Sequence, residues 1–349
     1  MKLALICPSN LLYMPYVNNY INILDSLNIE YKVINWDRLS VAEEINGYTF
    51  KDKKKQHQRN YYDYFKYKRF IIEKLENEKF DKIIVFTLQL GYFIKKYLVN
   101  NFSGDYIFDI RDYNKIFRFS DFAELIRLSY SCVISSPGYK EWLPQSDKYL
   151  VNHNTTITSL NELDCYNVKK YNEAVNILTI GVLRHWNVNI DFVNQLKNSN
   201  KYNLIFHGEG NINDKLKSYV ENNNINNIQL YGRYKKEEEG DIYKSIDLVN
   251  TLLYADNINC RTLLSNRLYN AVLYGKPMLS LDGTYQAEII RDYGVGLVVK
   301  SLDNLKDQIT DYLKTFSYEQ YNRGRVEFIT SVIKENKQFE RIVKNFISS

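Results

Sequence analysis

The sequence predicts an α/β protein built from two domains, each a doubly wound parallel sheet. Three observations lead to this fold class. The chain has 349 residues, which is long for one hydrophobic core. From Lys2 onward a buried strand, a polar loop, a helix and a second strand follow one another. The same alternation begins again at Val175. Such sheets bind ligands at the carboxyl ends of their strands, so polar residues there are the first site candidates.

The composition is that of a folded globular protein, with 45% apolar and 25% charged residues. Four cysteines, Cys7, Cys132, Cys165 and Cys260, form neither a zinc pattern nor a disulfide framework, which favours a reducing cytoplasm. No acidic pair indicates a metal, and we expect no cofactor. The amino-terminal apolar run is too short for a signal peptide, and no run approaches the ~20 residues that cross a bilayer. We therefore expect a soluble, cytoplasmic protein.

Apolar runs in the first half of the chain predict six strands, at 2–7, 30–35, 82–87, 106–109, 132–135 and 149–151. Ser9 and Asn10 follow the first strand and are candidates for the acceptor side of a site at the strand ends. The turn that begins at Pro8 would also account for both residues.

Charged residues directly follow the strand at 106–109. Asp109, Arg111 and Asp112 stand at the carboxyl end of a buried strand, where charges are costly unless they face a site or a partner. One interpretation places all three in a ligand-binding cleft, with Asp112 or Asp109 as the base that activates an acceptor. The other is that Asp109 and Arg111 pair with each other or cap the next helix.

Lys51–Arg69 interleaves basic and aromatic residues. A solvated loop and helix face is the simplest interpretation. The second is docking on an anionic membrane surface, such as the inner membrane face, since each basic residue near it adds roughly 1 kcal/mol of binding free energy. The third is nucleic-acid binding, which we rank last because no nucleic-acid motif accompanies the segment.

The polar segment Asn152–Thr156 carries the predicted domain boundary. We expect one domain over residues 1–152, a second over 153–330 and a carboxyl-terminal helix over 331–349. His153 lies at the crossing and is an acceptor-side candidate, although a linker residue would also stand there. The terminal helix has a one-sided apolar stripe that includes Phe328, Val332, Phe339 and Phe346. This stripe fits packing back on the first domain and also docking on the second.

The most informative stretch is Arg261–Gly283, which predicts a helix followed by a buried strand. Ser265 and Asn266 are residue types that cap a helix start, and Gly275 suits the left-handed turn that closes a helix. The start of such a helix presents N–H groups and the positive end of its dipole to an anion. Arg261 and Arg267 stand beside that start, so this stretch predicts a phosphate site.

The same stretch resembles the signature of GT-B glycosyltransferases of family 4, also called group 1. The family pattern is a polar residue, a lysine or arginine, an apolar residue, an aromatic residue and a glutamate, followed by Gly-Lys-Pro. It stands here as Asn266–Asn270 and Gly275–Pro277. The preceding loops follow the family's order, with a glycine-and-arginine loop, then Gly-x-Gly, then Tyr-Gly-Arg-Tyr after successive strands. The resemblance is strong over Val175–Val299 and looser over the first 150 residues.

This resemblance implies a GT-B fold whose two domains face a cleft and whose terminal helix crosses back toward the first domain. It also implies a nucleotide diphosphate sugar as co-substrate, held by backbone N–H groups and cations. The donor-binding candidates are Arg184, Gly208, Tyr231, Gly232, Arg233, Arg261, Thr262, Ser265, Asn266, Arg267 and Asn270. Arg184 is the main cation of its loop, and the alternative is that Arg184 and Arg233 are surface residues.

The chain departs from the family pattern at charged positions. Thr262 and Asn270 stand where many members carry two glutamates eight residues apart, one for sugar hydroxyls and one for the ribose. Asn270 can still bond a ribose hydroxyl, and Thr262 can bond a sugar hydroxyl without carrying charge. Arg111 stands where many members carry a histidine near the reacting sugar.

The resemblance therefore implies metal-independent transfer of a hexose-like sugar to a glycan or lipid-linked glycan, in capsule, surface-polysaccharide or glycoconjugate synthesis. The absent acid pair leaves two alternatives open. One is a non-catalytic partner subunit of another transferase, and the other is a nucleotide-sugar epimerase of similar architecture.

Overall fold

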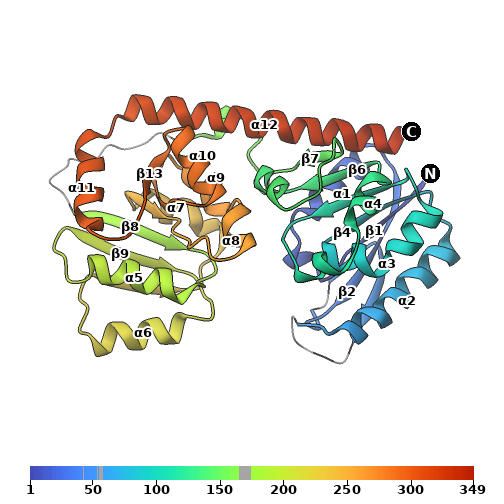
Figure 1. The fold of residues 1–349 in the computed structure, drawn as a ribbon, viewed down its shortest axis with the longest axis horizontal. Helices are drawn as coiled ribbons and strands as arrows, with labels where there is room; N and C mark the ends of the chain where they lie inside the picture. Colours follow the sequence, from blue (N-terminus) through green and yellow to red (C-terminus); the bar gives the residue numbers. More distant parts are fainter. Residues whose placement is uncertain (42, 53, 55–57, 165–173) are drawn as a thin grey trace. The chain divides into compact units, whose positions relative to one another are not determined.

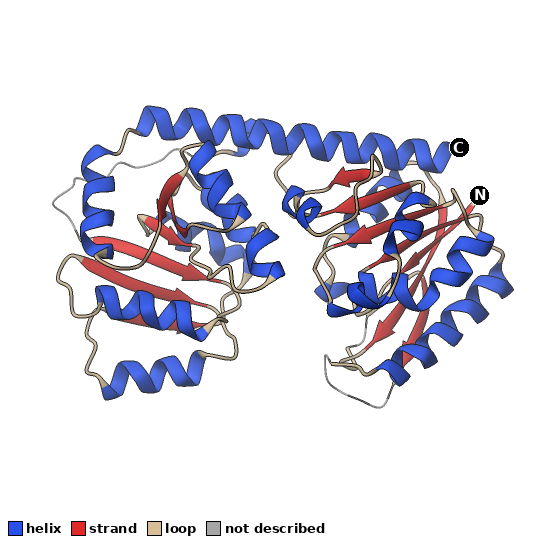
Figure 2. Ribbon diagram, in the orientation of Figure 1, coloured by secondary structure: helices blue, strands red, loops and turns tan. Residues whose placement is uncertain are grey.

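The computed structural model describes residues 1–41, 43–52, 54, 58–164 and 174–349, and it divides into two compact units. Unit 1 comprises Met1–Asn154 and Lys334–Ser349, and unit 2 comprises Thr155–Ile333. Each unit contains a parallel sheet flanked by helices (Figure 1, Figure 2). The predicted fold class of two doubly wound α/β domains is confirmed. Cys165 and residues 53 and 55–57 of the basic segment lie outside the described residues.

The sheet of unit 1 has seven strands in the order β3-β2-β1-β4-β5-β6-β7. The strands are β1 Lys2–Ile6, β2 Glu30–Asp37, β3 Gly47–Lys51, β4 Lys82–Phe86, β5 Tyr106–Ile110, β6 Ser131–Ile134 and β7 Tyr149–Val151. The helices are α1 Val17–Ser26, α2 Tyr61–Glu78, α3 Leu88–Asn101 and α4 Phe122–Arg127. Strand β3 was not predicted, because it is a partly exposed edge strand without a continuous apolar run.

The sheet of unit 2 has six strands in the order β10-β9-β8-β11-β12-β13. They are β8 Val175–Ile180, β9 Tyr202–His207, β10 Ile228–Gly232, β11 Leu248–Asn250, β12 Met278–Leu281 and β13 Gly296–Val299. The helices of this half are α5 Trp186–Leu196, α6 Asn213–Asn222, α7 Glu239–Lys244, α8 Ile258–Thr262, α9 Asn266–Leu273, α10 Tyr285–Asp292, α11 Leu305–Thr315 and α12 Tyr318–Ser348. Short 3-10 turns lie at Leu11–Tyr13, Lys115–Phe119, Pro137–Glu141, Leu160–Glu162 and Lys236–Glu238.

Alternation along the strands builds two hydrophobic layers in unit 2. Ile177 and Leu204 join the core that includes α5, α6 and α11, whereas their neighbours Leu178 and Ile205 join the core that includes α7, α9 and α10. Successive side chains of a strand point to opposite faces, so continuous apolar strands are buried on both sides. This is why these strands could be predicted from apolar runs alone.

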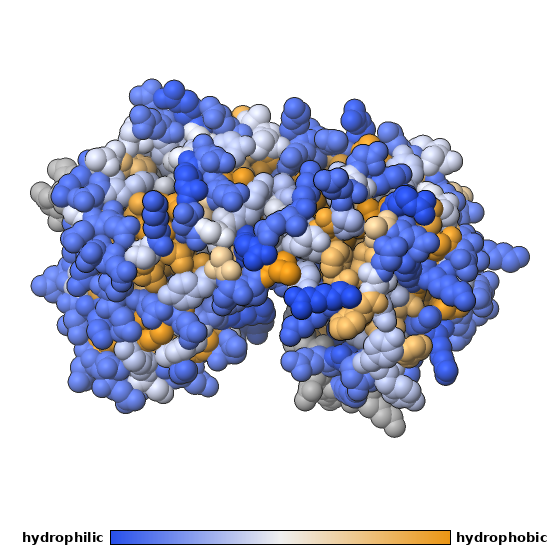
Figure 3. Space-filling model, viewed as in Figure 1, coloured by the Kyte–Doolittle hydropathy of each residue, from blue (hydrophilic) through white to orange (hydrophobic). Residues whose placement is uncertain are grey.

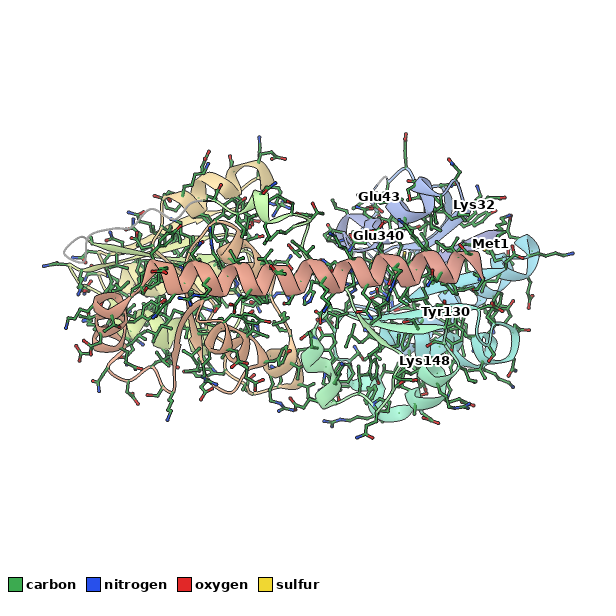
Figure 4. All side chains as sticks on the ribbon, turned by 90° about the horizontal axis from the view of Figure 1, so that it is seen from above. Met1, Lys32, Glu43, Tyr130, Lys148 and Glu340 are labelled. Atoms are coloured by element: carbon green, nitrogen blue, oxygen red, sulfur yellow. The ribbon has the colours of Figure 1, made fainter. Side chains whose placement is uncertain are left out.

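The apolar stripe of α12 packs into the hydrophobic cores of both units, with the first half of the helix in unit 2 and the second half in unit 1. Phe328 and Val332 lie in a core cluster of unit 2, and Phe339 and Phe346 lie in the core of unit 1 with α1 and the sheet. The ring of Phe346 stands 5.0 Å from that of Tyr130, which is labelled beside the helix in Figure 4. The terminal helix therefore packs on the first domain, as predicted, while its first half belongs to the second.

Hydrophilic residues cover most of the visible face of each unit (Figure 3). No helix in the described part of the chain is both long enough and apolar enough to span a membrane.

Candidate functional site

The polar loops of unit 2 gather at the carboxyl ends of its central strands. Because β8 pairs with both β9 and β11, the winding of the chain reverses between β8 and β11, and this is where doubly wound sheets bind ligands. Arg267, in the first turn of α9, donates from Nη1 to the carbonyl oxygen of Asn250 at 3.1 Å. Since Asn250 ends β11, this hydrogen bond anchors Arg267 at the switch point.

Two further basic groups lie in the same neighbourhood. Arg184 is exposed in the loop after β8, and His185 follows it in a left-handed conformation with φ 60° at the start of α5. Protein atoms that displace water from the His185 ring lower its pKa. Arg267 and Arg184 lower that pKa further by charge repulsion, whereas Asp256 opposes the shift. Loss of solvent also lowers the pKa of Arg267. A bound anion would relieve these unfavourable interactions.

Close backbone packing explains the Gly-x-Gly loop after β9. Gly208 has φ 134°, and a Cβ atom there would lie 1.8 Å from the carbonyl oxygen of Gly181. At Gly210 a Cβ would lie 1.9 Å from the oxygen of Leu183. The N–H of Gly208 also donates to the oxygen of Gly232 at 2.6 Å. The loops after β8, β9 and β10 thus form one backbone surface that only glycine allows.

An aromatic pair stands at the predicted nucleoside side of this surface. The rings of His207 and Tyr231 stack with centroids 4.5 Å apart and planes 6° apart. Tyr231 is 58% exposed, so its outer face is open to a further ring. Arg233, two residues later, is exposed as well. Tyr231 lies near the end of β10 and Arg233 directly follows that strand, and the contact of either residue with a base stays a prediction.

The structure adds Glu239 to the predicted residues. This carboxylate is buried, and its Oε1 accepts from Asn270 Nδ2 at 3.0 Å and from the Tyr234 hydroxyl at 3.4 Å. Lys236 bonds the other oxygen. Burial raises the pKa of Tyr234 to about 12, and the negative charge of Glu239 and its hydrogen bond to the phenol raise it in the same direction. In the sequence, Glu239 is the last of five consecutive charged residues, Lys235–Glu239, a pattern typical of a solvent-exposed segment. Only its tertiary contact with Asn270 distinguishes Glu239 from the other charged residues of this segment.

Two predicted details of the α9 region are corrected. Thr262 is fully buried and its hydroxyl donates to the carbonyl of Ile258 at 2.7 Å, so it does not present that hydroxyl to a sugar. Ser265 is the N-cap residue of α9 but its side chain does not cap the helix, because it donates to Gln286 Oε1 at 2.7 Å. Asn266 is exposed as the first residue of α9, and Arg261 is partly exposed near the end of α8.

In unit 1 the structure supports pairing of Asp109 and Arg111. Arg111 Nε and Nη2 each lie 2.6 Å from an oxygen of Asp109, and both side chains are buried. The Tyr20 hydroxyl donates to Asp109 at 2.6 Å, and Arg111 donates to Asn152 Oδ1 at 2.9 Å. Burial alone would lower the pKa of Arg111, but the Asp109 carboxylate raises it. Asp109 and Arg111 are thus corrected from catalytic candidates to a structural ion pair.

The remaining first-half candidates separate by exposure. Asp112 is exposed after β5 and remains the acceptor-side base candidate. Ser9 is partly exposed after β1, whereas Asn10 is buried and donates to Asp37 Oδ1 at 3.0 Å. His153 is buried, with its Nε2 against Glu335 of α12. Asn10 and His153 are therefore corrected from acceptor contacts to structural residues.

No group of three or more metal-ligating side chains occurs among the residues that the structure describes. That finding concerns side-chain clusters alone, and metal independence stays a prediction.

Comparison with known proteins identifies the same architecture. Residues 167–323 match the family model of the glycosyl transferases group 1. No curated protein matches the chain by sequence. Among solved structures, sucrose-phosphate synthase from Thermosynechococcus elongatus superposes with a TM-score of 0.69 at 12% identity, over 100% of this chain and 99% of that one.

Two further solved structures cover 99% and 100% of this chain. The apo form of the lipopolysaccharide outer core galactosyltransferase WaaB gives a TM-score of 0.70 at 14% identity, over 99% of this chain and 100% of that one. Anabaena Alr3699/HepE in complex with UDP-glucose gives 0.62 at 12% identity, over 100% of both chains. These likenesses show the two-domain GT-B fold.

Proposed function

We propose that the protein, whose residues 167–323 match the model of the glycosyl transferases group 1, is a GT-B glycosyltransferase that moves a sugar from a nucleoside diphosphate sugar to a glycan or lipid-linked glycan. Unit 2 would bind the donor and unit 1 the acceptor. The setting that we propose is synthesis of a capsule, another surface polysaccharide or a related glycoconjugate. The Anabaena neighbour was solved with UDP-glucose, which supports a sugar nucleotide as donor.

The observation that carries this proposal is the cationic switch point of unit 2. Arg267 is anchored on the end of β11, and both it and Arg184 depress the pKa of His185. Backbone N–H groups and guanidiniums together can stabilise the negative charge that develops on a departing diphosphate. The protein would then need no metal for this step.

On the acceptor side, Asp112 would take the proton from the attacking hydroxyl. It is exposed at the carboxyl end of β5, while its neighbours Asp109 and Arg111 are engaged with each other. A carboxylate in hydrogen-bond reach of the acceptor hydroxyl is the usual base for such a transfer.

The donor site can be tested by ligand binding. Wild-type protein should show a higher melting temperature with one or more of uridine, guanosine, cytidine and adenosine diphosphate, because a ligand bound only by the folded state stabilises it. By calorimetry, Arg184→Ala and Arg267→Ala should each weaken binding of the preferred nucleotide by roughly 10- to 100-fold, the value of one charge-assisted hydrogen bond. Arg323→Ala, an exposed arginine on α12, is the matched control. Wild-type affinity in both test variants would remove the two arginines from the site.

We further propose peripheral membrane contact through the exposed face of α2. Tyr61, Tyr62 and Phe65 are exposed there, and Lys66 lies 4.6 Å from the centre of the Tyr62 ring. Aromatic rings and basic groups suit the boundary of an anionic bilayer. Co-sedimentation with vesicles that contain phosphatidylglycerol, but not with phosphatidylcholine vesicles, should be lost in Tyr62→Ser/Phe65→Ser. Equal sedimentation of wild type and variant would contradict this contact.

A non-catalytic partner subunit is the second candidate function. It is favoured by the positions of the missing acid pair, where Thr262 is buried and Asn270 bonds Glu239. Release of nucleoside diphosphate from a donor panel by the purified protein, abolished by Arg184→Ala, would exclude this candidate.

A further inference from the structure

A pocket of about 410 Å³ in unit 1 contains neither the donor-site residues nor Asp112, and among its lining residues only Tyr61, on the exposed face of α2, has been assigned a role so far. Its walls come from the turn after β2, the start of α2, the first turns of α3 and the segment after β5. These elements follow neighbouring strands at the carboxyl edge of the sheet, where doubly wound domains bind ligands. In Figure 1, α2 and α3 lie side by side, and the rings of Tyr64 from α2 and Phe93 from α3 stack with their centroids 4.9 Å apart.

The pocket is cationic and rich in carboxamides. Its lining residues include Arg38, Gln58, Gln89 and Asn114. Within the described part of the chain, neither aspartate nor glutamate is among the lining residues. Carboxamides and aromatic rings suit a sugar, and an arginine suits a carboxylate or phosphate carried by that sugar.

Arg38 is held in place by the aromatic residues around it. The carbon at the centre of its guanidinium lies 4.4 Å from the centre of the Trp36 ring and 5.3 Å from that of Tyr64. Its Nη2 donates to the Tyr64 hydroxyl at 2.9 Å. Stacking and this hydrogen bond fix the planar group before a ligand arrives, which lowers the entropy cost of binding.

The second arginine of the pocket, Arg59, is engaged in an ion pair. It bonds Asp52 through Nε at 2.7 Å and through Nη2 at 3.1 Å. Arg59 Nη2 also donates to the carbonyl of Arg38 at 2.9 Å, so it acts as a positioning residue for that turn. The carboxylate of Asp37 accepts hydrogen bonds from Asn10 Nδ2 and from the N–H of Val41. Arg38, which lines the pocket and whose guanidinium is held over the Trp36 and Tyr64 rings, is the arginine that we assign to an anionic ligand.

The start of α3 adds a second source of positive potential. Gln89 lies in the first turn of this 14-residue helix, which contains no acidic residue there. Thr87, the N-cap residue, makes no cap hydrogen bond with its side chain. The positive end of the helix dipole and the Arg38 guanidinium therefore act on the same pocket.

From these observations we propose that this pocket is the acceptor subsite and that it binds an anionic sugar through Arg38. The proposal rests on the proposed function and specifies its acceptor class as a glycan residue that bears a carboxylate or a phosphate. The carboxamides of Gln58, Gln89 and Asn114 would contact the hydroxyls of that sugar.

The test uses the full-length protein and three probes: glucuronic acid, glucose 6-phosphate and glucose. Saturation-transfer NMR titrations should show one or both anionic probes binding at least about tenfold more tightly than glucose, the value of a single charge-assisted hydrogen bond. A preference for glucuronic acid indicates a uronate acceptor, and a preference for glucose 6-phosphate indicates a phosphorylated one. Equal affinities for all three probes would overturn the proposal.

Variants locate the binding. Arg38→Met should abolish the preference for anions, and Arg69→Met, an exposed arginine on α2, should keep it while changing the net charge equally. Gln89→Glu supplies a second variant that does not disturb the stacked residues, since a carboxylate is favourable in the first turn of a helix. It should also abolish the anion preference, by repulsion. Wild-type preference in both Arg38→Met and Gln89→Glu would place the anion elsewhere and refute the assignment.

Nucleotide binding is measured on the same samples. Wild-type protein that binds a nucleoside diphosphate but no anionic sugar would contradict this subsite alone. Protein that binds no nucleoside diphosphate would instead contradict the proposed function.

Discussion

Replacing Asp109 by asparagine should destabilise unit 1 without acting on the chemistry directly. The carboxylate accepts from Arg111 Nε, Arg111 Nη2 and the Tyr20 hydroxyl, each at 2.6 Å, and it is fully buried. The asparagine side chain would keep the shape of the aspartate but leave the Arg111 guanidinium buried without a counter-charge.

The expected cost follows from the geometry. Removal of one partner from a buried ion pair costs about 3–5 kcal/mol of unfolding free energy, since the other charge remains without compensation. For a unit of this size, such a loss lowers the melting temperature by roughly 6–20 °C. Asp109→Leu/Arg111→Met removes both charges and should cost less than Asp109→Asn alone.

Urea unfolding followed by tryptophan fluorescence can measure this loss in one unit. In a Trp186→Phe background the remaining tryptophans, Trp36 and Trp142, both lie in unit 1. Asp112→Asn is the control, and it should change the unfolding free energy by less than about 0.5 kcal/mol because Asp112 is exposed. If Asp109→Asn unfolds like wild type yet has lost turnover, the carboxylate is catalytic and the structural assignment is wrong.

Three further predictions follow from local geometry. The pKa of His185 is lowered in the free protein, and bound phosphates should raise it. Binding of a nucleoside diphosphate sugar should therefore take up a proton, and it should strengthen as the pH falls from the His185 pKa of the complex toward the lower pKa of the free protein, by up to tenfold per unit of pKa difference. Calorimetry in two buffers checks this, and His185→Gln should show no uptake. Gly208→Ala should destabilise unit 2 by about 1–3 kcal/mol or more in thermal unfolding, because the new Cβ would clash with the carbonyl oxygen of Gly181. Gly181→Ala is the control, and it should cost less because its Cβ would enter open space. Phe346→Ala should lower the unfolding free energy of unit 1 by about 3–5 kcal/mol in urea. Arg341→Ala, an exposed residue of the same helix, should leave it almost unchanged. Equal effects of the two variants would show that the α12 stripe does not stabilise unit 1.

The order of strands and helices could be predicted because it depends on local patterns. Strands such as β8 and β9 are buried on both faces, so they appear in the sequence as continuous apolar runs. Gly275 closes α9 with φ 66°, as its position after a helical pattern predicted. The family signature likewise lies within one stretch of chain, so the GT-B class could be inferred before any coordinates.

Side-chain partners could not be predicted in the same way, because the contacts that decide between alternative pairings come from distant parts of the chain. Asp109 stands two residues from Arg111, and the sequence left both pairing and a cleft position open. Both side chains are buried and the Tyr20 hydroxyl also bonds Asp109, so the structure favours pairing of Asp109 with Arg111 over a position in the cleft. Glu239 looked like one acid in a charged run until the fold brought it within 3.0 Å of Asn270.

The sequence alone determined that the chain forms two doubly wound domains, since apolar periodicity and turn residues act over a few positions. Tertiary structure decided which charged groups are buried in ion pairs, as Asp109 and Arg111 are, and which are exposed. Arg38 illustrates the difference, because its guanidinium lies over the Tyr64 ring only when the turn after β2 packs against α2, and no local sequence pattern predicts that contact.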